Sequence, residues 1–150
     1  MQKSVFFLTL NVEQDIFLMA CSVIARCYLR SKVIVVLCTE LEQAKKLDEL
    51  LWQYPKNRFL PHELIDDKTR QAQENIQILN DIALVQIYDC LICLDYNAEY
   101  VKSNHHCSII DFVPYDPILK EKARSRYKSY TQQGFKIKTM PVMQYIQKGE

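Results

Sequence analysis

Hydrophobic and polar positions along the chain follow two different periods. The apolar run VFFLTL at 5–10 is typical of a buried strand, and apolar positions three and four apart over 12–30 predict an amphipathic helix. The run KVIVVLC at 32–38 is nearly continuous and β-branched, as in a central strand covered on both faces. Thr39 is the expected N-cap of a second helix, which ends near Pro55.

The middle of the chain carries shorter elements of both kinds. Strands alternating with helices predict an α/β fold, a single domain over 1–150 with a mostly parallel central sheet flanked by helices. The remaining predicted elements are strands at 58–62, 76–80, 89–94 and 107–115, a polar surface loop at 63–75 and a short helix at 97–105.

The stretch DPILKEKARSRYKSY at 116–130 has a cation at every second position from Lys120 to Lys128. A strand here would lack a core face, whereas a helix gains an apolar stripe of Leu119, Ala123, Tyr127 and Tyr130. Asp116 would be the N-cap, Pro117 the first helical residue, and Gly134 would lie just past the end. The sequence therefore predicts a helix over 117–133.

On that helix the alternating cations separate onto two sides of the apolar stripe. Lys120, Arg124 and Lys128 form one row, while Lys122 and Arg126 lie on the other side. Tyr127 borders the first row, and an aromatic edge beside three cations suits a short acidic peptide that carries an apolar side chain. A solvated basic face and a nucleic-acid contact are the alternative interpretations.

Charge is distributed unevenly along the chain. The net charge is +1, but residues 117–150 hold eight Lys or Arg against Glu121 and Glu150, while the first 116 residues hold eleven bases and sixteen acids. Such a split indicates either that the C-terminal part meets an anionic partner or that the chain has an internal charge asymmetry without a partner. The first fifteen residues lack the features of a signal peptide and no run approaches a membrane span, so we expect a cytoplasmic protein with reduced cysteines.

Several kinds of site are disfavoured. With only Gly134 and Gly149, the chain cannot form a glycine-rich phosphate loop, so a nucleotide-binding-like fold here would lack one. Cys90 and Cys93 should point to opposite faces of a strand, which argues against zinc with His105, His106 or Cys107. No catalytic set assembles, and we expect neither metal nor cofactor. Asp95 is interpreted as a cap, His62 as a structural residue near a turn, and Trp52 as a core or interface aromatic.

The segments KKLDELLW, RFLPHEL and DFVPYDPILKEKARSRYKSYTQQGF resemble, in this order, the chi subunits of bacterial DNA polymerase III. The resemblance implies a nucleotide-binding-like α/β domain without a phosphate loop and no enzymatic activity. It implies two partners: the psi subunit, which connects chi to the clamp loader, and the acidic C-terminal tail of single-stranded-DNA-binding protein, which ends in Pro-Phe. A DNA-repair helicase is a further partner proposed for the psi-facing side.

The same resemblance implies site residues. Val113 and Tyr127 would form a pocket for the terminal phenylalanine of the tail, Arg124 would bind its carboxylate, and Lys120 and Lys128 would attract its acidic residues. Phe59 would contact psi, although a buried position at a strand start is an equal alternative.

Two segments depart from the family pattern. Residues 65–77 resemble nothing in it, and 136–150 form a possible C-terminal extension. That extension is predicted to add a strand at FKIKTM or to pack over the tail-binding groove.

Overall fold

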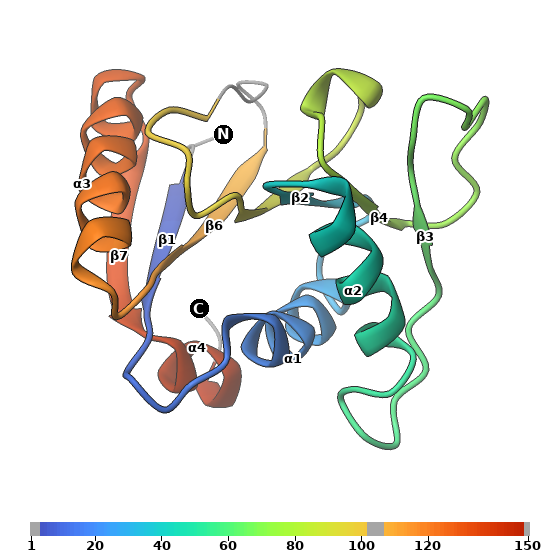
Figure 1. Ribbon diagram of the computed structural model, residues 1–150, viewed down its shortest axis with the longest axis horizontal. Coiled ribbons are helices and arrows are strands. Elements are labelled where there is room, and N and C mark those ends of the chain that lie inside the picture. The colour runs from blue at the N-terminus through green and yellow to red at the C-terminus, as the bar shows by residue number, and fades with distance from the viewer. Residues whose placement is uncertain (1–3, 102–106, 149–150) are drawn as a thin grey trace.

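The computed structural model describes residues 4–101 and 107–148, in which seven parallel strands form one sheet (Figure 1). The spatial order is β3-β4-β2-β5-β6-β1-β7, and every neighbouring pair is parallel. The predicted α/β class is confirmed, and the sheet is entirely parallel. The strands are β1 Ser4–Thr9, β2 Ile34–Cys38, β3 His62–Leu64, β4 Ile76–Leu79, β5 Cys90–Leu94, β6 Ser108–Val113 and β7 Lys136–Pro141.

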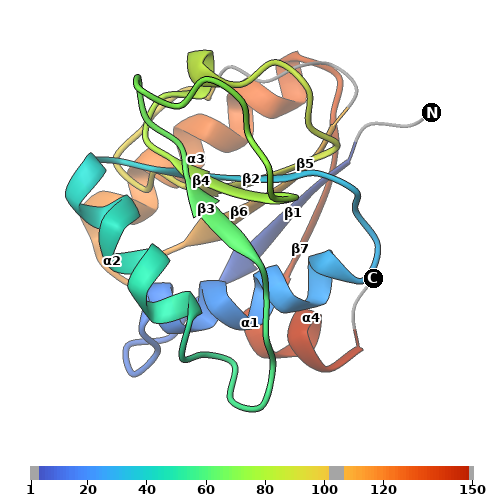
Figure 2. The same cartoon turned by 90° about the vertical axis from the view of Figure 1, so that its right-hand side faces the viewer.

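Helices cover both faces of the sheet (Figure 2). Three helices pack on one face, where α1 and α2 contact each other and α4 packs against α1. The longest helix, α3, lies on the opposite face over β6 and β7. The helices are α1 Ile16–Tyr28, α2 Leu41–Leu51, α3 Pro117–Gln132 and α4 Val142–Lys148, and a 3-10 turn, η1, spans Ile82–Leu84.

The buried residues form two clusters, one on each side of the sheet. All residues of β2 and β5 are buried, as expected for central strands covered on both faces. Side chains alternate between the clusters along each strand, so Cys90 belongs to the cluster under α1 while Cys93 belongs to the one under α3. The prediction that these two thiols face apart is confirmed.

The structure corrects two predicted capping residues, Thr39 and Asp95. Glu40, and not Thr39, is the N-cap of α2, and its backbone N–H donates to the side chain of Gln43. The Thr39 hydroxyl instead donates to the Asp95 carboxylate at 2.9 Å, so this pair links the ends of β2 and β5, and Asp95 caps no helix.

Two further predictions of local structure are wrong. The strand expected at 58–62 begins only at His62, because Arg58–Pro61 do not pair with the sheet. The helix expected at 97–105 is not formed over its described part, 97–101, where the carbonyl of Ala98 accepts a hydrogen bond from buried Arg126. A tertiary contact overrides the local pattern there. The C-terminal segment forms β7 beside β1, and α4 follows. Of the two expectations for this segment, the added strand is therefore the one that the structure shows.

All six cysteines are buried thiols. Burial raises the pKa of Cys38 from 9.0 to about 12, and the Asp95 carboxylate adds to this rise. The pKa of the Cys21 thiol is raised in the same way: burial, and then the Asp15 carboxylate, raise it to about 11. A thiol with a raised pKa stays protonated in the folded chain after the unfolded chain has lost that proton.

We therefore expect the free energy of unfolding to fall as pH rises above 9. Between its unfolded and folded pKa, the Cys38 thiol should contribute a loss of about 1.4 kcal/mol per pH unit. Urea denaturation at several pH values between 8 and 10, compared between the natural protein and Cys38→Ala, would measure this. The variant should show the shallower pH dependence, and equal slopes would contradict the prediction.

Candidate functional site

A cavity of about 280 Å³ lies between α3 and the β1, β6 and β7 strands. Phe7 and Thr9 are alternate residues of β1 and so share one face of the sheet. Val113 of β6 is paired with Thr9, and Thr139 of β7 is paired with Phe7. These four side chains form the floor of the cavity.

The walls come from one face of α3. Lys120, Ala123, Arg124 and Tyr127 are spaced by three and four residues, so they lie above one another on the helix. The small side chain of Ala123 leaves room above the floor, and the Tyr127 ring packs against Phe7 with 5.5 Å between ring centroids. We call the space lined by these eight residues the α3 cavity.

The lining combines an apolar interior with a cationic rim. Its volume is near the lower end of ligand pockets, roughly 300 Å³, which suits one or two side chains better than a larger ligand. The ammonium of Lys120 lies 5.2 Å from the centre of the Tyr115 ring, and the Arg124 guanidinium is exposed at the rim. Such a site fits an apolar group that carries a carboxylate.

Four of the five residues expected to bind an acidic tail lie around this cavity: Val113, Lys120, Arg124 and Tyr127. Lys128 is exposed one turn further along α3 and does not line the cavity. The sequence had not indicated the floor residues Phe7, Thr9 and Thr139. The alternation along 5–10 shows that Phe7 and Thr9 share a face, but only the topology shows that α3 covers that face.

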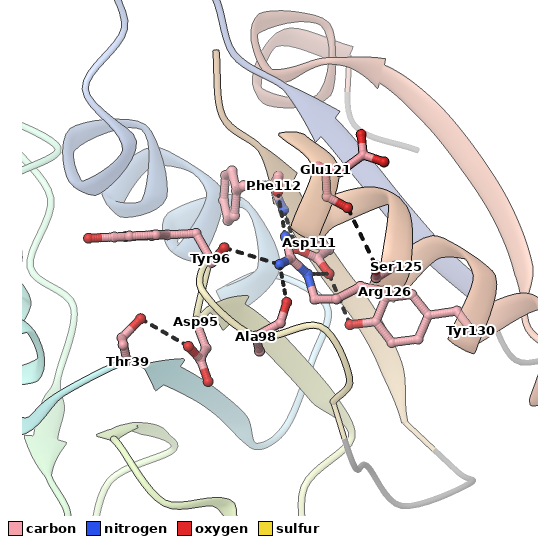
Figure 3. Close-up of polar contacts among 10 residues, drawn as sticks. All are labelled: Thr39, Asp95, Tyr96, Ala98, Asp111, Phe112, Glu121, Ser125, Arg126 and Tyr130. Carbon is pink, nitrogen blue, oxygen red and sulfur yellow. Dashed lines mark hydrogen bonds and ion pairs between the residues drawn. The ribbon is translucent and has the colours of Figure 1, made fainter. Parts of the chain in front are cut away.

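Arg126 corrects the predicted distribution of cations on α3. It was expected on the exposed second row, yet its side chain is fully buried. Figure 3 shows its guanidinium among acceptors from two segments of the chain, β6 and the segment that follows β5. Nε and Nη2 donate to the two carboxylate oxygens of Asp111 at 2.8 and 3.1 Å, Nη2 also donates to the Phe112 carbonyl, and Nη1 donates to the carbonyls of Tyr96 and Ala98.

The position of Arg126 follows from helix geometry and from the strand beneath it. Ala123, Arg126 and Tyr130 are the buried residues of α3. Asp111 of β6 points toward them, and its carboxylate also accepts from the Tyr130 hydroxyl at 2.9 Å. Burial alone would lower the pKa of Arg126, but the Asp111 carboxylate outweighs this effect and the pKa is raised, so the guanidinium stays charged. We call Asp111, Arg126 and Tyr130 the Asp111 cluster; it fixes α3 above β6.

A second surface feature is a pair of exposed aromatic rings near the end of α2. Phe59 is 73% exposed and Trp52 is 53% exposed, and their ring centroids are 5.8 Å apart. The alternative of a buried Phe59 is therefore wrong. Exposed aromatic side chains that pack together are typical anchors of protein interfaces. We call these two residues the Trp52–Phe59 surface.

His62 supports this surface from beneath. Its ring lies 4.1 Å from that of Trp52, measured between centroids. Nδ1 is 2.7 Å from the carbonyl oxygen of Leu60, and Nε2 is 2.9 Å from that of Asp48 in the last turn of α2. The predicted structural role of His62, bonding the backbone near a turn, is confirmed.

Helix α3, which forms the walls of the cavity, and strand β3, which follows Phe59 in the chain, lie at opposite ends of the sheet (Figure 1). The cavity is built on β6, β1 and β7, whereas Phe59 lies three residues before β3 at the other edge and contacts Trp52 at the end of α2. The six strand spacings between β3 and β7, at about 4.8 Å each, separate the two edges by roughly 30 Å. The two surfaces are therefore well separated on the molecule.

Two other kinds of feature, metal sites and membrane-spanning helices, are absent from the part of the chain that the structure describes. Within residues 4–101 and 107–148, no three His, Cys, Asp or Glu side chains come together as a metal site. His105 and His106, weighed above as zinc ligands, lie outside the described residues. Among the helices described, none combines the length and apolar character needed to cross a membrane.

Comparison with known proteins identifies relatives over most of the chain. Residues 1–138 match the family described as "DNA polymerase III chi subunit, HolC". The chain is 36% identical over 132 residues to DNA polymerase III subunit chi of Haemophilus influenzae, covering 87% of this chain and 88% of the relative. It is 31% identical over 122 residues to DNA polymerase III subunit chi of Escherichia coli, covering 81% and 82% of the two chains.

Proposed function

This chain belongs to the family of DNA polymerase III chi subunits, and we propose that it serves DNA replication as a non-catalytic adaptor in the cytoplasm. In this proposal the α3 cavity binds the acidic C-terminal tail of single-stranded-DNA-binding protein. The Trp52–Phe59 surface binds the psi subunit, which connects the adaptor to the clamp loader. The separation of the two surfaces supports a bridging role, because both partners can be held at once.

The observation that carries the tail-binding proposal is an apolar cavity of side-chain size with cations at its rim. The terminal phenylalanine of the tail would enter between Val113 and Tyr127. Arg124 would bind the terminal carboxylate, because its planar guanidinium can donate two parallel hydrogen bonds. Lys120 at the rim and Lys128 one turn beyond it would attract the acidic residues that precede the phenylalanine.

A titration with a fluorescent acidic peptide that ends in Asp-Ile-Pro-Phe tests this function by anisotropy. We expect the same peptide without its last residue to bind about 10- to 150-fold more weakly, because burial of an aromatic side chain contributes about 1.5–3 kcal/mol. Arg124→Ala should weaken binding of the intact peptide, whereas Lys122→Ala, on the other side of α3, should not.

The rival function is direct binding of nucleic acid by the basic helix over residues 117–133. Burial of Arg126 removes one of its five alternating cations from such a contact. A nucleic-acid binder would retain single-stranded oligonucleotide with a steep dependence on salt and little dependence on any one cation. Binding of oligonucleotide without binding of the intact peptide would establish the rival and overturn the adaptor proposal for this surface.

The psi-binding proposal rests on the exposure of Phe59 and on its contact with Trp52. Because His62 holds the Trp52 ring from beneath, the pair is ordered before a partner arrives, which lowers the entropic cost of association. A DNA-repair helicase that used the same two rings would compete with psi, and a competition experiment with both partners would reveal this.

A further inference from the structure

The Arg124 guanidinium is already bound to a carboxylate of its own helix. Its Nη1 donates to Oε2 of Glu121 at 2.6 Å, and both side chains are more than two-thirds exposed. Glu121 lines a shallow hollow on the other side of α3 together with Glu99, Ile118 and Lys122, whereas Arg124 lines the α3 cavity. The pair therefore extends across α3 between the two.

We propose that Glu121 is an internal competitor for Arg124, which lowers the affinity of the α3 cavity for ligands that end in a carboxylate. This inference rests on the proposed tail-binding function of the cavity. Among the described residues, Glu121 is the only side chain that pairs with the Arg124 guanidinium. A ligand carboxylate must either displace Glu121 or share the guanidinium with it.

The negative charge of Glu121 lowers the affinity for the ligand carboxylate whether Glu121 is displaced or shares the guanidinium. If the terminal carboxylate takes the Nη1 donor, the Glu121–Arg124 hydrogen bond is lost. If the two carboxylates share the guanidinium, they repel each other at short range. The Glu121 side chain points away from the buried Asp111 cluster in Figure 3, so a substitution there should leave the support of α3 intact.

The opposite role is also chemically possible and predicts the opposite result. Glu121 could hold Arg124 in the orientation that a ligand needs, in which case its removal would weaken binding. Glu121→Gln separates the two roles, because the amide oxygen can still accept a hydrogen bond from Nη1 while the negative charge is gone.

The inference is tested by the anisotropy titration with the peptide ending in Asp-Ile-Pro-Phe. We expect Glu121→Gln to bind this peptide about two- to fivefold more tightly than the natural protein at low salt, and the gain to shrink as salt increases. Glu99→Gln is the matched control, since it removes an equal charge from the same hollow without a contact to Arg124. A peptide with an amidated C-terminus lacks the carboxylate that competes with Glu121. The natural protein and Glu121→Gln should therefore bind the amidated peptide with nearly the same affinity.

The outcomes distinguish this inference from the proposed function. The competitor role of Glu121 would be supported if Glu121→Gln, but not Glu99→Gln, binds the peptide more tightly than the natural protein does. The gain in affinity should disappear when the peptide is amidated. Unchanged or weaker binding by Glu121→Gln, while the natural protein binds the peptide, would overturn the competitor and leave the tail-binding function standing. Failure of both proteins to bind any of the peptides would overturn the function and the inference together.

Discussion

Replacing Arg126 with alanine is expected to lower the free energy of unfolding by about 3–5 kcal/mol. The variant would leave the Asp111 carboxylate buried without its counter-charge, and the carbonyls of Tyr96, Ala98 and Phe112 would lose a donor. Urea denaturation at neutral pH measures this loss. Arg124→Ala is the matched control: it removes the same side chain two positions earlier, where the group is exposed, and should change stability by about 0.5 kcal/mol or less.

A loss of less than about 1 kcal/mol in Arg126→Ala would show that the Asp111 cluster does not hold α3 as described. The result also bears on binding experiments. Because α3 carries four of the eight residues that line the α3 cavity, Arg126→Ala should weaken peptide binding through misplacement of the helix. It is therefore unsuitable as a charge control, and Lys122→Ala takes that role.

Phe59→Ala is expected to weaken the complex with the psi subunit by about 2–4 kcal/mol, or roughly 30- to 1000-fold, the range for an aromatic anchor at the centre of an interface. Stability of the free protein should barely change, because the ring is 73% exposed. Isothermal titration of purified psi into each variant would measure the effect. Trp52→Ala should weaken the complex too, and the two effects should not add, since the rings are in contact.

Tyr100→Ala provides the control for this experiment. Tyr100 is another exposed aromatic residue, 58% accessible, in the segment that follows β5. Its replacement should leave psi binding unchanged. If Phe59→Ala binds psi as tightly as the natural protein does, the Trp52–Phe59 surface is not the psi interface, and another partner must account for its exposure.

Much of the fold could be predicted from the sequence, because the spacing of apolar residues within one element shows which of its faces are buried. The apolar run at 32–38 contains β2, and helical spacing over 12–30 contains α1. The limits of α3 follow from its capping residues: Asp116 accepts from the Leu119 backbone N–H, and Gly134 adopts the positive φ of 89° that terminates the helix. Burial on both faces of β2 and the caps of α3 were decided within one short stretch of the chain, and there the prediction was correct.

The failures occurred where a distant residue decided the local conformation. Residues 97–101 could have continued a helical pattern, but the carbonyls of Tyr96 and Ala98 are engaged by Arg126 from α3. A charged residue such as Arg126 is ordinarily expected in solvent. Nothing near it in sequence indicates burial, because its partner Asp111 is fifteen residues away on β6.

The sequence by itself determined the α/β class, the amphipathic α3 helix and the row of Lys120, Arg124 and Lys128, since each depends on spacing within one element. Tertiary structure alone decided that Phe7, Thr9, Val113 and Thr139 form the floor under that row. These residues come from three strands that are far apart in the chain and are brought together by the register of β1 with β6 and β7. The order and register of the strands in a parallel sheet depend on how all the strands are buried together. No short stretch of the sequence therefore determines them.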